Sequence, residues 1–204
     1  ATARALAAAG FHVVVGARRA ERIESLATEI GGDAIPLDVS DRESVDAFAA
    51  RLPRLNVLVN NAGGALGLEP VAESVDEKWR AMWETNVLGL MMMTRACLPA
   101  LEASGAGHIV NIGSIAGLES YPGGAGYTSA KHGVVAITET LRVELLGKPI
   151  RITEVDPGMV ETEFSLVRFD GDSDRASNVY RGLKPLTAAD IADIIAFAVL
   201  DLPT

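Results

Sequence analysis

Short runs of β-branched residues alternate with amphipathic helical segments along the whole sequence, and this alternation limits the folds open to it. The predicted strands cover residues 11–17, 34–38, 56–60, 108–113 and 150–155. The predicted helices cover residues 20–30, a segment that opens at Ser40, and residues 74–103, 125–146 and 187–200. Repeated strand–helix units form a parallel sheet with helices on both faces. We therefore predict an α/β fold, a doubly wound parallel sheet of Rossmann-like type in three α/β/α layers.

Two of the predicted helices carry a start signal. Ser40 is followed at the third position by Glu43, and Ser74 in the same way by Glu77. A serine whose hydroxyl accepts from the third helical amide, with a glutamate reaching back to the serine amide, forms a capping box. We therefore expect Ser40 and Ser74 to cap their helices.

The charge balance excludes several classes of partner. Lys and Arg total 18 against 27 Asp and Glu, a net charge of −9. This surplus repels phosphate backbones and anionic lipid, so neither nucleic acid nor a membrane is an expected partner. No apolar run approaches the ~20 residues that cross a bilayer. The single cysteine, Cys97, cannot form an internal disulfide. We expect a cytoplasmic protein that acts on a small molecule, and we predict no metal site.

Tyr127 and Lys131 are the strongest candidates for catalytic chemistry. They lie four residues apart on one predicted helix, so both side chains project from the same face. A nearby ammonium favours the phenolate and lowers the pKa of a phenol toward the range that a general acid or base needs. Ser114 follows the strand 108–113, so strand end and helix can converge on one substrate oxygen. Taken alone, the pair could also be a surface tyrosine beside a solvated lysine.

Several motifs occur in a characteristic order along the chain. They are Asn60-Asn61-Ala62-Gly63, Asn86, Gly113-Ser114, Tyr127 with Lys131, and the run 157–162, Pro-Gly-Met-Val-Glu-Thr. Together they resemble the motifs of the short-chain dehydrogenase/reductase family and span nearly the whole chain. The resemblance implies an oxidoreductase that acts on CH–OH groups with a nicotinamide cofactor. It also implies a catalytic tetrad of Asn86, Ser114, Tyr127 and Lys131.

The resemblance implies a role for each member of this tetrad. Tyr127 exchanges a proton with the substrate hydroxyl or carbonyl, and Ser114 orients that oxygen. Lys131 lowers the pKa of the tyrosine and holds the nicotinamide ribose, while Asn86 positions a water that connects Lys131 to solvent. Simpler explanations exist for single residues: Asn86 could bond its own helix backbone, and Ser114 could be a turn serine.

The same resemblance assigns cofactor contacts. Besides Tyr127 and Lys131 these are Asp38 and Val39 at the adenine, Asn60, Ala62 and Gly63 under the adenosine ribose, and Pro157, Gly158, Val160 and Thr162 at the nicotinamide.

The choice of cofactor follows from the residues after the predicted strand 11–17. An NAD site places a carboxylate there, but the stretch 16–19 reads Gly-Ala-Arg-Arg. Arg18 and Arg19 would bind a 2′-phosphate through charge-assisted hydrogen bonds, which predicts NADP(H). The alternative is that the two arginines only open a solvated helix.

Residues 1–204 are expected to form a single dinucleotide-binding and catalytic domain, because the sequence shows no repeat and no linker. Residues 1–10 are typical of the back half of a helix that Gly10 ends. Residues 200–204 break off where another strand is expected. We therefore expect the family's first strand with its Gly-rich, pyrophosphate-binding turn, and its last strand, to be absent from the given sequence.

A closer resemblance narrows the substrate. Residues 60–70 and 163–172 are similar to the serine and L-allo-threonine dehydrogenases, which act on 3-hydroxy acids with NADP and reduce semialdehydes. The resemblance implies hydride transfer to or from a small 3-hydroxy acid or β-hydroxy amino acid. Two alternatives have the same fold: a 3-oxoacyl thioester or general carbonyl reductase, and a nucleotide-sensing regulator. The acidic charge disfavours thioester docking, and the complete tetrad disfavours a regulator.

Arg168 is a further candidate for substrate binding, together with Ser114 and Tyr127. It is the only cation in residues 161–173. A guanidinium binds a carboxylate in a forked geometry that lysine cannot copy. The alternative is that Arg168 pairs on the surface with a nearby acid, either Asp170 or Asp172.

The predicted helix 74–103 suggests self-association. Trp79 and Trp83 share one of its faces, and beyond Asn86 it is apolar nearly all round, which implies burial on more than one side. Similar family members assemble as homotetramers through this helix and the one bearing Tyr127. We therefore expect a homotetramer, a dimer of dimers; the alternative is a purely intramolecular core.

Overall fold

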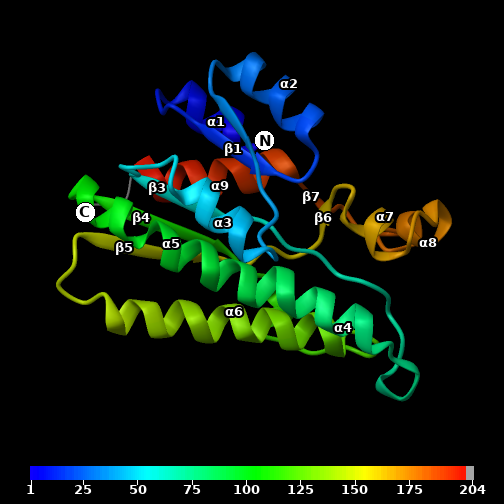
Figure 1. Ribbon diagram of the computed structural model, residues 1–204. Helices are drawn as coiled ribbons and strands as arrows, with labels where there is room; N and C mark the ends of the chain where they lie inside the picture. Colours follow the sequence, from blue (N-terminus) through cyan, green and yellow to red (C-terminus); the bar gives the residue numbers. More distant parts are fainter. Residues whose placement is uncertain (201–204) are drawn as a thin grey trace.

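The computed structural model describes residues 1–200, and its strands are all paired in parallel (Figure 1). The strands are β1 (Val14–Ala17), β2 (Asp33–Pro36), β3 (Val57–Asn60), β4 (Gly107–Ile112), β5 (Ile150–Val155), β6 (Val160–Glu161) and β7 (Leu186–Thr187). β3, β4 and β5 form one sheet in that order, while β1 pairs with β2 and β6 with β7. The α/β fold class is confirmed, with the strands of residues 1–200 in three separate groups. The strand expected after residue 200 falls outside the described residues.

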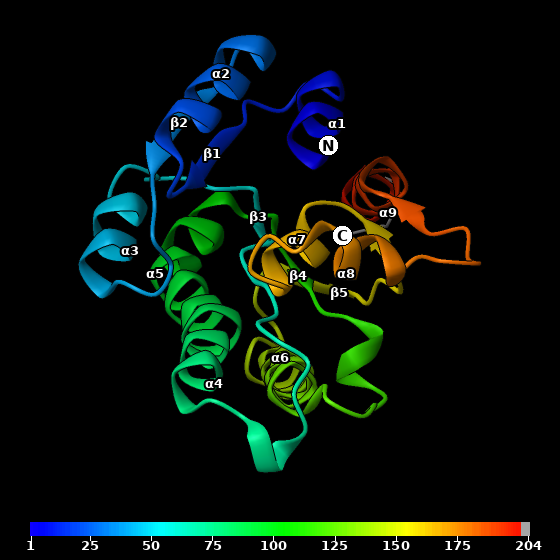
Figure 2. The same cartoon turned by 90° about the vertical axis from the view of Figure 1, so that its right-hand side faces the viewer.

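Helices cover both faces of the β3–β4–β5 sheet (Figures 1 and 2). They are α1 (Thr2–Ala8), α2 (Ala20–Ile30), α3 (Arg42–Ala49), α4 (Asp76–Trp83), α5 (Gly89–Ser104), α6 (Ala125–Glu144), α7 (Phe164–Arg168), α8 (Ser173–Asn178) and α9 (Ala188–Leu200). α3, α5 and α6 lie on one side, and α1 and α9 on the other. Along residues 1–200, no helix has the length and apolar character needed to cross a membrane.

The core divides into two layers because successive side chains of a strand point to opposite faces. On β4, Ile109 packs against Cys97 and Leu101 of α5, while Val110 packs against Leu6 of α1 and Ile195 of α9. Apart from Leu6, these residues are almost completely buried. A strand that is apolar at successive positions is thus buried on both faces, as expected of a parallel sheet.

The two predicted capping boxes are wrong. Asp41 caps α3 by accepting a hydrogen bond from the Glu43 amide at 3.0 Å. Ser40 lies one residue before the cap position, and its hydroxyl donates to the carboxylate of Asp38 at 2.6 Å. Ser74 bonds back to a preceding carbonyl, and α4 begins at Asp76 without a side-chain cap.

The predicted helix 74–103 runs through three segments. α4 continues into a π-helical turn, Glu84–Leu88, and then into α5, with right-handed helical backbone at both junctions. A π turn inserts one residue into the helical repeat and is frequent at functional sites. Asn86 lies within this turn and is buried.

A chain of buried hydrogen bonds links the sheet to α5 and α6. The side-chain amide of Asn60 donates to the Thr94 hydroxyl at 3.0 Å and to Asn111 Oδ1 at 2.9 Å. The amide of Asn111 donates in turn to Thr138 Oγ1 at 2.9 Å. Asn60 and Asn111 are register partners on β3 and β4. The network therefore fixes the carboxyl ends of two strands against the helices that cover them.

We predict that Asn111→Ala lowers the free energy of unfolding by about 2–3 kcal/mol, because it leaves buried polar groups of two partners unsatisfied. Urea unfolding followed by circular dichroism measures the change. Asn61→Ala is the matched control, since Asn61 is exposed and its loss should cost less than about 0.5 kcal/mol. Equal losses in the two variants would contradict a structural role for the network.

Candidate active site

The predicted site residues gather at the carboxyl ends of the parallel strands. Asn60 ends β3, Ser114 follows β4, and Pro157 follows β5. Because β3, β4 and β5 are parallel neighbours, these positions share one edge of the sheet. Ligands of open α/β sheets bind at this edge.

Ser114 and Tyr127 are brought together as predicted, but the pKa of the tyrosine moves in the opposite direction. Burial raises the pKa of Tyr127 to about 12, while its hydrogen bond with Ser114 and the charge of Arg168 act the other way. The Nζ atom of Lys131 lies 5.8 Å from the centroid of the Tyr127 ring. The net shift is therefore opposite to the predicted lowering, because desolvation of the phenol outweighs the nearby charges.

Lys131 is buried and bonded to the end of β4. Its Nζ atom donates to the carbonyl of Ile112 at 2.7 Å. Burial lowers the pKa of Lys131 to about 8, and the carboxylates of Asp156 and Glu154 oppose this shift. Lys131 is thus mostly charged at neutral pH. The negative charges that compensate it are Glu154 on β5 and Asp156 directly after this strand.

The Asn86 side chain hydrogen-bonds both to the loop after β3 and to the preceding turn of its own helix. Its Oδ1 atom accepts from the Gly64 amide at 3.2 Å, and its Nδ2 atom donates to the carbonyls of Gly64 at 2.9 Å and Met82 at 2.7 Å. A Cβ atom at Gly63 would lie 2.5 Å from Asn86 Oδ1 and 3.8 Å from Lys131 Nζ. Asn86 and Lys131 therefore flank Gly63, and the bond to Met82 agrees with the simpler explanation of Asn86.

The side chain of one predicted cofactor residue is engaged elsewhere. The Asn60 side chain points into the buried network with Thr94 and Asn111, so a contact with the adenosine ribose would have to come from the Asn60 backbone. Ala62 and Gly63 are exposed where β3 ends. The sequence alone does not show which neighbours the side-chain amide of Asn60 will bind.

The other predicted cofactor residues lie at the same edge. The Asp38 carboxylate accepts from Ser40, and Val39 packs closely on Gly89 of α5. The remaining members, near the nicotinamide in the predicted arrangement, are Pro157, Gly158, Val160 and Thr162 in the chain from β5 to α7. The Pro157 and Val160 carbonyls accept from Ile115 and Tyr180, the Thr162 hydroxyl accepts from Phe164, and Gly158 borders open space.

Arg18 and Arg19 are exposed just beyond β1. Arg19 donates to Glu163 at 3.0 Å, and Arg22 of α2 binds the same carboxylate at 3.0 Å. The two guanidinium groups lower the pKa of Glu163, that of Arg19 most. Arg22 was not predicted as part of the site, because no sequence pattern links α2 to a residue so distant in the chain.

Residues 163–170 form a flap over the predicted catalytic tyrosine. The rings of Phe164 and Tyr127 meet edge to face with centroids 5.5 Å apart. Arg168 Nε donates to the Gly67 carbonyl at 2.8 Å, and its Nη1 atom donates to the Tyr121 hydroxyl at 3.2 Å. Its Nη2 atom is buried and has no hydrogen-bond partner.

The surface pairing considered for Arg168 is wrong, because both acids have other partners. Asp170 lies 3.6 Å from Lys78 Nζ, and Asp172 caps α8 by accepting from the Arg175 amide at 2.9 Å. Arg168 therefore turns inward instead of toward its neighbours in sequence.

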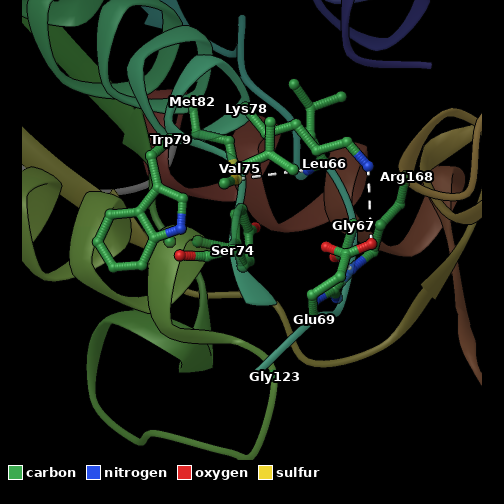
Figure 3. Close-up of a pocket in the computed structure, with 12 residues that line it drawn as sticks. Leu66, Gly67, Glu69, Ser74, Val75, Lys78, Trp79, Met82, Gly123 and Arg168 are labelled. Atoms are coloured by element: carbon green, nitrogen blue, oxygen red, sulfur yellow. Dashed lines mark hydrogen bonds and ion pairs between the residues drawn. The ribbon is translucent and has the colours of Figure 1, made fainter. Parts of the chain in front are cut away.

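A small pocket lies between Arg168 and α4. Figure 3 shows Arg168, Gly67 and Glu69 on one side and Trp79 on the other. Tyr127 also lines this pocket, and Lys78 Nζ lies 3.6 Å from Glu69. Sequence reasoning missed Glu69 and Lys78, since single charges in a loop and on a helix carry no motif. Within residues 1–200, no three His, Cys, Asp or Glu side chains are grouped to hold a metal ion.

The site thus combines two hydroxyl groups, a buried ammonium and a guanidinium at the carboxyl edge of the sheet. These groups belong to Tyr127 and Ser114, Lys131, and Arg168. A family model described as short chain dehydrogenase matches residues 1–171. The chain belongs to this family. It is therefore an oxidoreductase, and the resemblance found in the motifs is confirmed.

Relatives across the family agree with this assignment. An uncharacterized oxidoreductase of Mycobacterium tuberculosis (strain ATCC 25618 / H37Rv) is 62% identical over 197 residues, 97% of this chain and 78% of the relative. An NADP-dependent 3-hydroxy acid dehydrogenase of Schizosaccharomyces pombe is 45% identical over 196 residues, 91% of this chain and 76% of the relative. The closed form of a serine dehydrogenase complexed with NADP+ superimposes with a TM-score of 0.94 at 39% identity, covering 99% of this chain and 84% of that one.

Proposed function

We propose that this protein is an NADP-dependent oxidoreductase that transfers hydride between the nicotinamide and a small 3-hydroxy acid or β-hydroxy amino acid. The observation that carries the proposal is the guanidinium of Arg168. Its carbon atom lies 6.0 Å from the centroid of the Tyr127 ring, and its buried Nη2 atom lacks a partner. A carboxylate bound there would satisfy that atom while the substrate oxygen meets Tyr127.

Two relatives support the substrate class. One is named as an NADP-dependent 3-hydroxy acid dehydrogenase and the other as a serine dehydrogenase complexed with NADP+. Both names describe a substrate with a hydroxyl group two carbons from a carboxyl group. A fixed guanidinium beside a fixed proton donor suits this separation of the two groups.

The tetrad residues divide the work of proton transfer. A pKa of about 12 keeps Tyr127 protonated at neutral pH, so the phenol can donate to a carbonyl oxygen during reduction. Ser114, hydrogen-bonded to Tyr127, holds the same oxygen. The Lys131 ammonium stabilises the phenolate that remains and is proposed to hold the nicotinamide ribose. Asn86 fixes the loop after β3. The bound cofactor supplies or accepts the hydride.

The residues at the strand ends fit a phosphorylated dinucleotide. Two exposed guanidinium groups, Arg18 and Arg19, follow β1 where a 2′-phosphate would be bound, and residues 16–19 contain no acid. Glu163 holds Arg19 in place but also competes with a phosphate for it. The other proposed contacts are Asp38, Val39, the backbone of Asn60, Ala62, Gly63, Pro157, Gly158, Val160 and Thr162.

We also propose a homotetramer, although the tryptophans support it less than expected. Trp83 Nε1 donates to Ser129 of α6 at 3.3 Å, and Trp79 packs on Gly126 of the same helix, so both make contacts within the chain. Leu88, in the π turn, is 46% exposed and remains available to a second copy. The cytoplasmic location stays a prediction.

The first prediction is that Tyr127→Phe lowers kcat by about 100-fold or more while NADPH still binds, because positioned proton transfer contributes about that much. Steady-state absorbance of NADPH gives kcat, and calorimetry gives the binding constant. Tyr121→Phe is the comparison variant: it removes a phenolic hydroxyl that accepts from Arg168, so it should act on KM and leave kcat near the wild-type value. Near-normal turnover of Tyr127→Phe would remove this tyrosine from the mechanism.

The second prediction concerns Arg18 and Arg19. Replacing both with Ala should raise KM for NADPH far more than KM for NADH. The lost charge-assisted hydrogen bonds should contribute about 2–3 kcal/mol of binding free energy in total. Arg4→Ala is the control, because its guanidinium is also exposed but pairs with Glu29 near the other end of α2. An unmodified enzyme that prefers NADH would refute the proposed cofactor choice.

The third prediction concerns Arg168. Arg168→Ala should raise KM for serine or 3-hydroxypropionate sharply and leave neutral alcohols or aldehydes, where accepted, little changed. Arg168→Lys should restore only part of the affinity, because lysine cannot form the forked pair. Equal losses on charged and neutral substrates would instead indicate that Arg168 only stabilises the flap. The enzyme would then be a general carbonyl reductase without selectivity for a carboxylate.

A further inference from the structure

Two carboxylates at the end of β5 have no part in the mechanism above. Glu154 lies on β5, and Asp156 follows this strand. A Cβ atom at Gly113 would collide with carboxylate oxygens of both residues, so the two side chains converge on one point beside the end of β4. A larger residue at position 113 would displace the two carboxylates from this point.

The hydrogen bonds of these carboxylates connect them to the active site. Asp156 Oδ1 accepts from the amide of Ser114 at 2.9 Å. Glu154 hydrogen-bonds with Thr138, but its Oε1 atom is buried and has no hydrogen-bond partner. A buried carboxylate oxygen without a donor is costly and calls for an electrostatic explanation.

The ammonium of Lys131 meets the same stretch of β4. Its Nζ atom binds the carbonyl of Ile112, directly before Gly113, so the cation and the two carboxylates bracket adjacent residues. Asp156 and Glu154 are the negative charges that raise the pKa of Lys131 against its burial. The attraction is mutual, since Lys131 acts to lower the pKa of Glu154.

Other charged and titratable groups face this cluster. Burial and Asp156 raise the pKa of Glu154, while Arg142 on α6 acts with Lys131 to lower it. Tyr127 faces Lys131 from the same helix, and Arg168 of the flap and Tyr121 act on that phenol. Neither of these two groups is among the charges that act on Lys131.

We propose that Glu154 and Asp156 form a pair of positioning carboxylates that keeps Lys131 in its ammonium form against the end of β4. A buried ammonium persists only where nearby negative charge compensates its lost hydration. Asp156 also fixes the backbone of Ser114, so the pair couples two members of the tetrad. The inference rests on the proposed role of Lys131 in catalysis.

The test is a titration of Lys131 in the protein without cofactor. Lysine labelled with ¹³C at Cε reports the ammonium by NMR, and the signal lost in Lys131→Arg assigns the residue. Glu154→Gln and Asp156→Asn should each lower the pH at which Lys131 titrates by about one unit, and the double variant should lower it further. Glu154→Asp, which keeps the charge, should restore most of the shift.

Glu139→Gln is the matched control, because Glu139 is exposed on the same helix as Lys131 and should leave the titration unchanged. The alkaline limb of the kcat profile should move to lower pH with the NMR titration, since the ammonium is lost as pH rises through its pKa. Denaturant unfolding verifies that each variant is folded; should Asp156→Asn not fold, Glu154→Gln decides alone.

Folded variants in which Lys131 titrates at the wild-type pH would overturn the inference and leave the two carboxylates with a structural role. The NMR readout needs no substrate. Failure of the proposed 3-hydroxy acid activity would therefore be distinguishable from failure of this inference.

Discussion

The hydrogen bond from the buried ammonium of Lys131 to the carbonyl of Ile112 determines the geometry of the site. It joins α6 to β4 at the point where the chain leaves the sheet, two residues before Ser114. One helical turn before Lys131, the same helix carries Tyr127, so this bond helps to place Tyr127 near Ser114, the two proposed partners of the substrate oxygen. A charge in this position requires compensation, and the carbonyl, the carboxylates and the bare backbone of Gly113 all serve that requirement.

The flap depends on contacts of unequal strength. Arg168 and Gly67 exchange two hydrogen bonds, from Nε to the carbonyl at 2.8 Å and from the Gly67 amide to the Arg168 carbonyl at 2.9 Å. The ion pairs at either end, made by Glu163 and by Asp170 with Lys78, involve partly exposed side chains. Exposed ion pairs contribute little to stability, so the hydrogen bonds between Arg168 and Gly67 stabilise the flap more than the two outer ion pairs do.

The sequence predicted those elements whose hydrophobic pattern is long enough to be read locally. β5 begins and ends as predicted, and β4 differs by one residue at each end, because both are short runs rich in β-branched residues between turn residues. α7 and α8 were missed because helices of 5 and 6 residues are stabilised by contacts rather than by their own pattern. Asp41 rather than Ser40 caps α3 because the helix begins at Arg42, one residue later than a Ser40 cap requires.

The site residues that a motif defines could be named from the sequence, but their electrostatics could not. Spacing identifies Tyr127, whereas the rise of its pKa follows from burial under Phe164 and the flap, which is a property of packing. Arg168 could be singled out but not placed, because two acids stood close to it in sequence. Only the fold shows that both acids are engaged elsewhere. A buried Nη2 atom without a hydrogen-bond partner is costly, and the carboxylate of the proposed substrate would supply the missing acceptor; substrate binding and the position of the flap would then depend on the same residue.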